Sequence, residues 1–126
     1  MTRVLLAEDG RENQLLIKTL LAKAGASVTV VPDGQRAVEE AMGALSAGKP
    51  YDVILMDMQM PVLDGYGATS KLRQLGYRRP IVALTAHAMD GDRERCVSAG
   101  CDDYLTKPVD RAKLTAVVAH FASRSE

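Results

Sequence analysis

The run that decides the fold is Val53-Ile54-Leu55-Met56, which leads directly into Asp57. It is apolar at every position, whereas a strand with one face in water alternates apolar and polar residues. A strand that is buried on both faces is typical of the centre of a parallel sheet, because the connecting helices pack against both of its sides. Residues 81–84 have the same character, so the sequence predicts two central strands.

Working outward, three further strands are predicted at residues 4–7, 28–31 and 103–105. Apolar residues at helical spacing lie between the strands. The expected stripes are Leu16, Leu20 and Leu21; Ala37, Val38, Ala41, Met42 and Leu45; Ala68, Leu72 and Leu75; and Leu114, Val117, Val118 and Phe121. A short polar helix is expected over residues 90–100. The strict alternation predicts one α/β domain over residues 1–126, with a parallel five-stranded sheet between two layers of helices.

Aspartates and glycines mark the expected helix ends. Asp33, Asp90 and Asp110 precede the second, fourth and fifth helices, as N-cap residues do. Glycines that can adopt the left-handed conformation follow the first three helices, at Gly25, Gly48 and Gly76.

Composition excludes several classes of protein. The 126 residues include 16 Lys+Arg and 16 Asp+Glu, so no excess of basic charge attracts the chain to nucleic acid or to a membrane surface. The apolar runs are too short to span a bilayer, and no signal peptide is visible at the start. Cys96 and Cys101 are too few for a disulfide framework and are expected to be free thiols. We therefore expect a cytoplasmic protein.

Polar side chains follow four of the predicted strands where each strand ends. The carboxyl ends of parallel strands meet at one edge of the sheet, where open α/β folds bind their ligands. The residues expected to meet there are Glu8, Asp9, Asp57, Thr85 and Lys107. Clustered carboxylates repel one another unless a cation is present. A hard divalent cation with oxygen ligands is therefore predicted, and Mg²⁺ (or Mn²⁺) leaves room for a substrate phosphate.

The same residues indicate phosphoryl transfer. An aspartate carboxylate can attack phosphorus and form an aspartyl phosphate, which makes Asp57 the candidate acceptor. Lys107 offers a positive charge and Thr85 a hydroxyl for the phosphoryl oxygens. Each residue alone has an ordinary explanation, as a helix cap, a turn residue, a strand-end hydroxyl or a solvated surface charge. Their joint placement on four strand ends favours the functional interpretation.

With these motifs the chain resembles, over essentially its whole length, the receiver domain of two-component response regulators. The matching residues are Leu6-Ala7-Glu8-Asp9, Met56-Asp57-Met58-Gln59-Met60-Pro61 followed by Asp64-Gly65, Leu84-Thr85-Ala86, and Lys107-Pro108. The resemblance implies a flavodoxin-like three-layer fold with strand order 2-1-3-4-5. It also implies a signalling domain, not an enzyme with a separate substrate, in which a phosphohistidine on a histidine kinase or histidine phosphotransfer protein phosphorylates Asp57.

The resemblance also assigns roles to single residues. Glu8, Asp9, Asp57 and the backbone carbonyl of Gln59 would hold Mg²⁺. Thr85 and Lys107 would contact the phosphoryl group, and the Lys107–Pro108 peptide would be cis. Thr85 and Tyr104 would report phosphorylation to the surface formed by the fourth helix, fifth strand and fifth helix. Gln59 and His87 would tune the lifetime of the phosphoryl group.

The output and the rival functions stay open from the sequence. Residues 13–16 and 84–89 are most similar to receivers attached to hybrid histidine kinases, although a single-domain regulator is also considered. A monomer, or a weak dimer that depends on phosphorylation, is expected. A haloacid-dehalogenase-like phosphatase would need a second Asp at the position of Gln59 and a nucleophile after the first strand. A flavodoxin-type cofactor binder would need a phosphate-binding loop where Glu8 and Asp9 stand.

Overall fold

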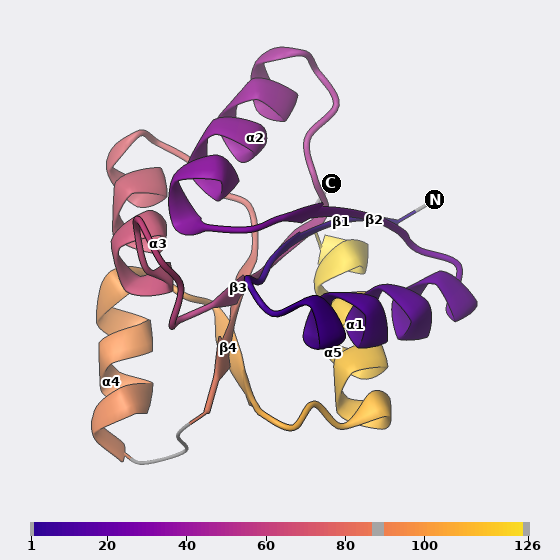
Figure 1. The fold of residues 1–126 in the computed structure, drawn as a ribbon. Helices are drawn as coiled ribbons and strands as arrows, with labels where there is room; N and C mark the ends of the chain where they lie inside the picture. The colour runs from indigo at the N-terminus through magenta and orange to yellow at the C-terminus, as the bar shows by residue number, and fades with distance from the viewer. Residues whose placement is uncertain (1, 87–89, 125–126) are drawn as a thin grey trace.

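The computed structural model describes residues 2–86 and 90–124. Strands and helices alternate along the chain, and the helices lie in two layers on either side of one sheet (Figure 1). The elements are β1 Arg3–Ala7, α1 Arg11–Lys23, β2 Ser27–Val31, α2 Gly34–Ser46, β3 Val53–Asp57, α3 Gly65–Gln74, β4 Ile81–Thr85, α4 Asp90–Ala99, β5 Asp103–Thr106 and α5 Arg111–Arg124.

The sheet has five parallel strands in the order β2-β1-β3-β4-β5. Helices α2, α3 and α4 cover one face, and α1 and α5 cover the other (Figure 1). Every residue of β3 and β4 is buried. The predicted fold, strand order and doubly covered central strands are therefore confirmed.

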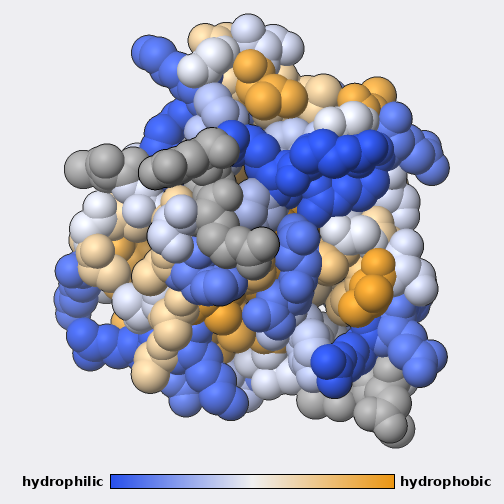
Figure 2. Space-filling view, turned by 180° about the vertical axis from the view of Figure 1, so that it is seen from behind, coloured by the Kyte–Doolittle hydropathy of each residue, from blue (hydrophilic) through white to orange (hydrophobic). Residues whose placement is uncertain are grey.

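Two apolar cores lie on the two faces of the sheet, and side chains that alternate along each strand divide between them. From β3, Ile54 and Met56 face the core under α2, α3 and α4. Val53 and Leu55 face the core under α1 and α5. From behind, the surface is mostly hydrophilic, and its apolar residues form separate small groups (Figure 2).

The predicted apolar stripe of α1 is wrong at Leu16. Ile17 and Leu21, an i, i+4 pair, are the buried residues of this helix, whereas Leu16 is 45% exposed and Leu20 is only partly buried. The helix carries apolar residues at positions 15, 16, 17, 20 and 21, so periodicity alone allows more than one buried face. Leu45 and Leu75 are also exposed, because they lie in the last turn of α2 and just beyond α3.

Most of the predicted helix ends are confirmed. Asp33 accepts a hydrogen bond from the Arg36 amide at 2.8 Å, and Asp110 accepts one from the Ala112 amide at 2.8 Å. Gly25, Gly48 and Gly76 all have positive φ. The predicted cap at Asp90 lies outside the side chains that the structure describes.

Helix α4 has few buried side chains. Cys96 is its one buried side chain among those described. Beyond the helix, the Arg73 guanidinium of α3 donates to the Gly100 carbonyl at 3.0 Å and to Asp102 at 2.9 Å. The polar sequence of α4 thus agrees with its weak packing in the structure.

The packing of α1 gives a direct test. Replacing Ile17 with Ala should lower the free energy of unfolding by about 2–5 kcal/mol, since it removes a fully packed side chain from the core. The matched control on the same helix, Leu16→Ala, should stay within about 1 kcal/mol of the wild type, because that side chain is exposed and belongs to neither core. Urea unfolding measures both. Equal losses in the two variants would contradict this packing.

Candidate functional site

The carboxyl edge of the sheet gathers the predicted site residues. Glu8 and Asp9 directly follow β1, Asp57 and Thr85 are the last residues of β3 and β4, and Lys107 directly follows β5. The register places Asp57 beside Leu84 and Thr85 beside Thr106. Because neighbouring strands end at the same level, five residues that lie far apart in the sequence reach one edge.

Three carboxylates crowd together at this edge. Glu8, Asp9 and Asp57 each contribute an oxygen that lies within 4.8 Å of the other two. Glu8 is 1% exposed and Asp57 is 3% exposed, while Asp9 is exposed. Burying ionised carboxylates is unfavourable unless cations or hydrogen-bond donors compensate them.

Lys107 supplies part of this compensation. Its Nζ lies 2.8 Å from Glu8 Oε1 and donates a hydrogen bond to Asp57 Oδ2 at 2.9 Å. The Lys107 amide donates to the Thr85 carbonyl at 2.8 Å, and the Lys107–Pro108 peptide is cis, as predicted. Burial alone would lower the pKa of the Lys107 ammonium, but its interactions with Glu8 and Asp57 outweigh burial and raise that pKa above its ordinary value.

The carboxylate oxygens of Glu8 and Asp57 have fewer hydrogen-bond donors within the described part of the chain than they could accept. The Gln59 amide donates to Asp57 Oδ1 at 3.0 Å, and the Gly10 amide donates to Glu8 Oε2 at 3.0 Å. Glu8 Oε1 is buried, and its one partner among residues 2–86 and 90–124 is the Lys107 ammonium at 2.8 Å. A buried carboxylate oxygen in this state, beside two further carboxylates, fits a hard divalent cation.

Glu8 and Asp9 precede Gly10, which is the N-cap residue of α1. Glu8 Oε2 accepts a hydrogen bond from the Gly10 amide at 3.0 Å, whereas Glu8 Oε1 lies 2.8 Å from Lys107 Nζ. Capping thus explains one oxygen of Glu8, but both carboxylates also belong to the acidic cluster at the edge of the sheet.

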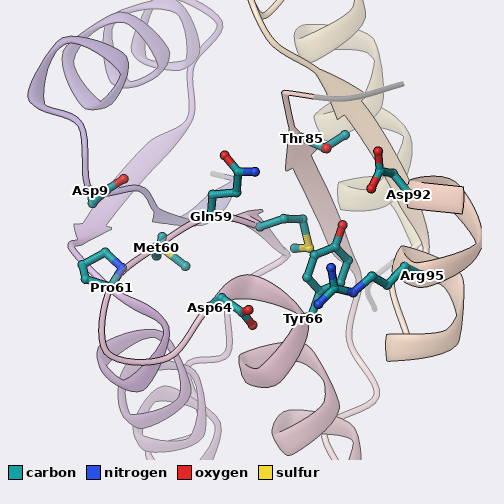
Figure 3. A pocket seen from close by; sticks show the side chains of 10 residues that line it. Asp9, Gln59, Met60, Pro61, Asp64, Tyr66, Thr85, Asp92 and Arg95 are labelled. Carbon is teal, nitrogen blue, oxygen red and sulfur yellow. The ribbon is translucent and has the colours of Figure 1, made fainter. Parts of the chain in front are cut away.

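A cavity of about 600 Å³ opens beside the carboxylates, and Asp9, Gln59 and Thr85 line it. Figure 3 shows the Gln59 side chain between Asp9 and Thr85. Thr85 is 4% exposed, whereas Gln59 is exposed. The cavity thus adjoins the acidic cluster at Asp9 and the end of β4 at Thr85.

The far wall of this cavity was not predicted from the sequence. Tyr66 of α3 and Arg95 of α4 line it, and the Arg95 guanidinium lies 3.9 Å from the centre of the Tyr66 ring (Figure 3). Burial raises the pKa of the Tyr66 hydroxyl to about 12. Neither residue belongs to a recognisable motif, since only the packing of α3 against α4 brings them together.

The remaining predicted residues are placed as follows. Tyr104 lies on β5, half-buried, with the Arg93 guanidinium 5.9 Å from its ring centre. His87 lies outside the described residues. Among the described residues, no helix has the length and apolar character needed to cross a membrane.

Comparison with known proteins identifies a family. The model of the response regulator receiver domain matches residues 4–119. Hybrid signal transduction histidine kinase I of Dictyostelium discoideum is 45% identical over 120 residues, which cover 92% of this chain and 7% of that protein. More generally, the chain spans 7–13% of the length of several histidine kinases that it matches.

Two solved structures are similar over nearly the whole chain. The receiver domain of the sensor histidine kinase PA1611 of Pseudomonas aeruginosa, solved with a magnesium ion in its active-site cleft, is 45% identical with a TM-score of 0.85 and covers 97% of this chain and 98% of that one. The receiver domain of Saccharomyces cerevisiae Ssk1, solved with the histidine phosphotransfer protein Ypd1, is 31% identical with a TM-score of 0.84 and covers 97% of this chain and 89% of that one.

The ion pairs of Lys107 predict a pH dependence. In metal-free buffer, Lys107→Met should lower the free energy of unfolding by about 3 kcal/mol, because it leaves buried carboxylates without their cation. The lysine has a higher pKa in the folded state than in the unfolded state, so its contribution is complete at neutral pH and is lost as pH rises through the raised pKa.

Urea unfolding of both proteins from neutral to strongly alkaline pH measures this difference. The control is Lys113→Met, which removes the same charge from an exposed position on α5. Equal losses for the two variants, or a difference that persists unchanged above the raised pKa, would show that the ion pairs of Lys107 do not stabilise the site.

Proposed function

The chain belongs to the response regulator receiver domain family of two-component and phosphorelay signalling, and we propose that its Asp57 is the phosphoryl acceptor. The observation that carries this proposal is a buried carboxylate, at the end of the central strand β3, that contacts Lys107 and lies beside two further acidic residues. Neither the fold nor the family supports the phosphatase alternative, since its second Asp is replaced by Gln59 and the acceptor follows the third strand.

The proposed donor is a phosphohistidine on a histidine kinase or histidine phosphotransfer protein. The phosphorus–nitrogen bond of the donor breaks as a bond forms between phosphorus and a carboxylate oxygen of Asp57, and the imidazole leaves with the electron pair of the broken bond. The similarity to the Ssk1 receiver, whose structure includes Ypd1, supports this class of donor. A cytoplasmic location accords with these partners.

The proposed metal ligands are Glu8, Asp9, Asp57 and the backbone carbonyl of Gln59, with Mg²⁺ as the cation. When bound, the cation would neutralise negative charge on the cluster and on the phosphoryl oxygens. The described residues fit this role, because three carboxylates lie together, Lys107 pairs with two of them, and the buried Glu8 Oε1 has no partner besides the Lys107 ammonium. The magnesium in the related PA1611 receiver supports the same identity of the ion.

Lys107 and Thr85 have complementary roles in this proposal. The Lys107 ammonium already lies 2.9 Å from Asp57 Oδ2, so it can follow the developing charge onto the phosphoryl oxygens with little movement. Thr85, on the adjacent strand, offers a hydroxyl to a phosphoryl oxygen from the other side of the cavity. Gln59 and His87 are proposed to govern the access of water, and hence the lifetime of the acyl phosphate.

The proposed output is a shift between two conformations of the surface formed by α4, β5 and α5. Thr85 is the last residue of β4, and Tyr104 lies on the adjacent strand β5. A displacement of Thr85 towards the phosphoryl group would leave space that Tyr104 can enter. Helix α4 can respond because few of its described side chains are buried.

The proposal predicts one phosphoryl adduct on Asp57. Incubation with Mg²⁺ and a small acyl-phosphate donor should add one phosphoryl group to the wild type, and intact-mass spectrometry detects it. Asp57→Asn should show no adduct, because the amide is not a nucleophile of this kind. Removal of Mg²⁺ with a chelator should suppress the adduct, because the carboxylates would then repel the phosphoryl oxygens.

A matched control is Asp64→Asn, since Asp64 also lines the cavity but caps α3 through the Gly67 amide at 2.8 Å. This variant should retain the adduct. Beryllofluoride, which mimics an acyl phosphate, distinguishes fast hydrolysis from an inactive site. A wild-type protein that shows neither an adduct nor a response to beryllofluoride would refute Asp57 as the acceptor.

A further inference from the structure

A single backbone hydrogen bond joins the start of α2 to the loop between β3 and α3. The Gly34 amide donates to the Leu63 carbonyl at 3.0 Å. Gly34 is the first residue of α2, so its N–H has no acceptor within the helix. The loop thus provides the hydrogen-bond acceptor for the first amide of α2, which lies about thirty residues earlier in the chain.

This contact leaves no space for a side chain at position 34. A Cβ atom there would lie 2.1 Å from the Leu63 carbonyl oxygen, 2.9 Å from the Leu63 carbonyl carbon and 3.0 Å from the Asp64 carbonyl oxygen. All three are backbone atoms, so a rotamer change cannot relieve the clash. Gly34 is not among the residues with positive φ, and the close approach of the loop is therefore what requires a glycine.

The loop itself is stiff and locally strained. The Leu63 amide donates to the Pro61 carbonyl at 2.8 Å, which closes a three-residue turn around Val62. Val62 has a φ of 69°, an unfavourable value for a β-branched residue, and it is 83% exposed, so its own burial does not offset the strain. Pro61 fixes its own φ and restricts Met60. The loop therefore has fewer free torsions to absorb a displacement of Leu63 than a loop without proline.

The other end of the loop is the candidate metal site. The Gln59 amide donates to Asp57 Oδ1 at 3.0 Å, and the Gly65 amide donates to the Met58 carbonyl at 3.2 Å. With the bond from Gly34, these contacts fix the loop at both ends. We propose that Gly34 is a positioning residue, whose contact with Leu63 holds the Gln59 carbonyl where a divalent cation needs it. This inference rests on the proposed function, and it makes α2 part of the site.

The test compares two alanine substitutions on the same helix. Gly43 also lies in α2, but a Cβ atom there would meet nothing within 4 Å. Gly43→Ala should bind Mg²⁺ like the wild type and gain stability, because alanine favours the helix. It therefore serves as the background for the double variant Gly34→Ala/Gly43→Ala. Isothermal titration with Mg²⁺ and thermal unfolding of the metal-free proteins are the two measurements.

The double variant should unfold cooperatively without metal and bind Mg²⁺ about tenfold more weakly than Gly43→Ala, the scale of effects of groups that orient metal ligands. Saturating Mg²⁺ should restore most of its rate of phosphorylation by an acyl phosphate, because the defect lies in occupancy of the site. Equal Mg²⁺ affinities in the two variants would overturn the inference and leave the proposed function intact. Failure of the double variant to fold would also overturn it, because Gly34 would then be structural. A wild type that does not bind Mg²⁺ would refute the metal site and this inference together.

Discussion

Three carboxylates, two of them buried, lie together at the carboxyl edge of the sheet, where Lys107 forms ion pairs with Glu8 and Asp57. The cluster therefore carries more negative charge than Lys107 can balance, and buried charge without compensation is unfavourable. The rest of the structure holds these charged residues together at the edge of the sheet. Two apolar layers fix the strands, the strand register fixes which residues reach the edge, and a hydrogen bond from the Lys107 amide to the Thr85 carbonyl holds the backbone of Lys107. A divalent cation would balance the negative charge that the fold leaves, and the anionic phosphoryl group would then be held by that cation and by Lys107.

This constraint also explains why the site can act as a switch. A phosphoryl group on Asp57 would change the charge at the point where Lys107, Thr85 and the loop that follows β3 converge. Helix α4 lies across the cavity and buries one described side chain, Cys96, while Arg95 contacts the Tyr66 ring from its surface. The well-packed part of the domain thus surrounds the candidate site. The weakly packed helix α4 lies at a surface that a partner could bind.

The features that can be predicted from the sequence are those that follow from a strand being buried on both faces. The wholly apolar runs around Leu55 and Ala83 indicate central strands, and the central strands in turn indicate which polar residues meet at the edge. The buried face of α1 could not be predicted in the same way, because its apolar residues cover more than one face and only tertiary packing selects Ile17 over Leu16. The Tyr66–Arg95 contact and the approach of Gly34 to Leu63 also depend on packing between separate elements, which periodicity and motif spacing do not encode.

The charge imbalance is tested most directly by the free energy of unfolding of the wild type and of Asp9→Asn as Mg²⁺ is added. Asp9 is exposed, so its substitution removes one negative charge from the cluster without disturbing the core. We expect Asp9→Asn to be the more stable protein without metal, and the wild type to overtake it as Mg²⁺ binds preferentially to the folded state. Parallel responses of the two proteins to Mg²⁺, or no response of the wild type, would show that excess negative charge at the cluster does not govern the site.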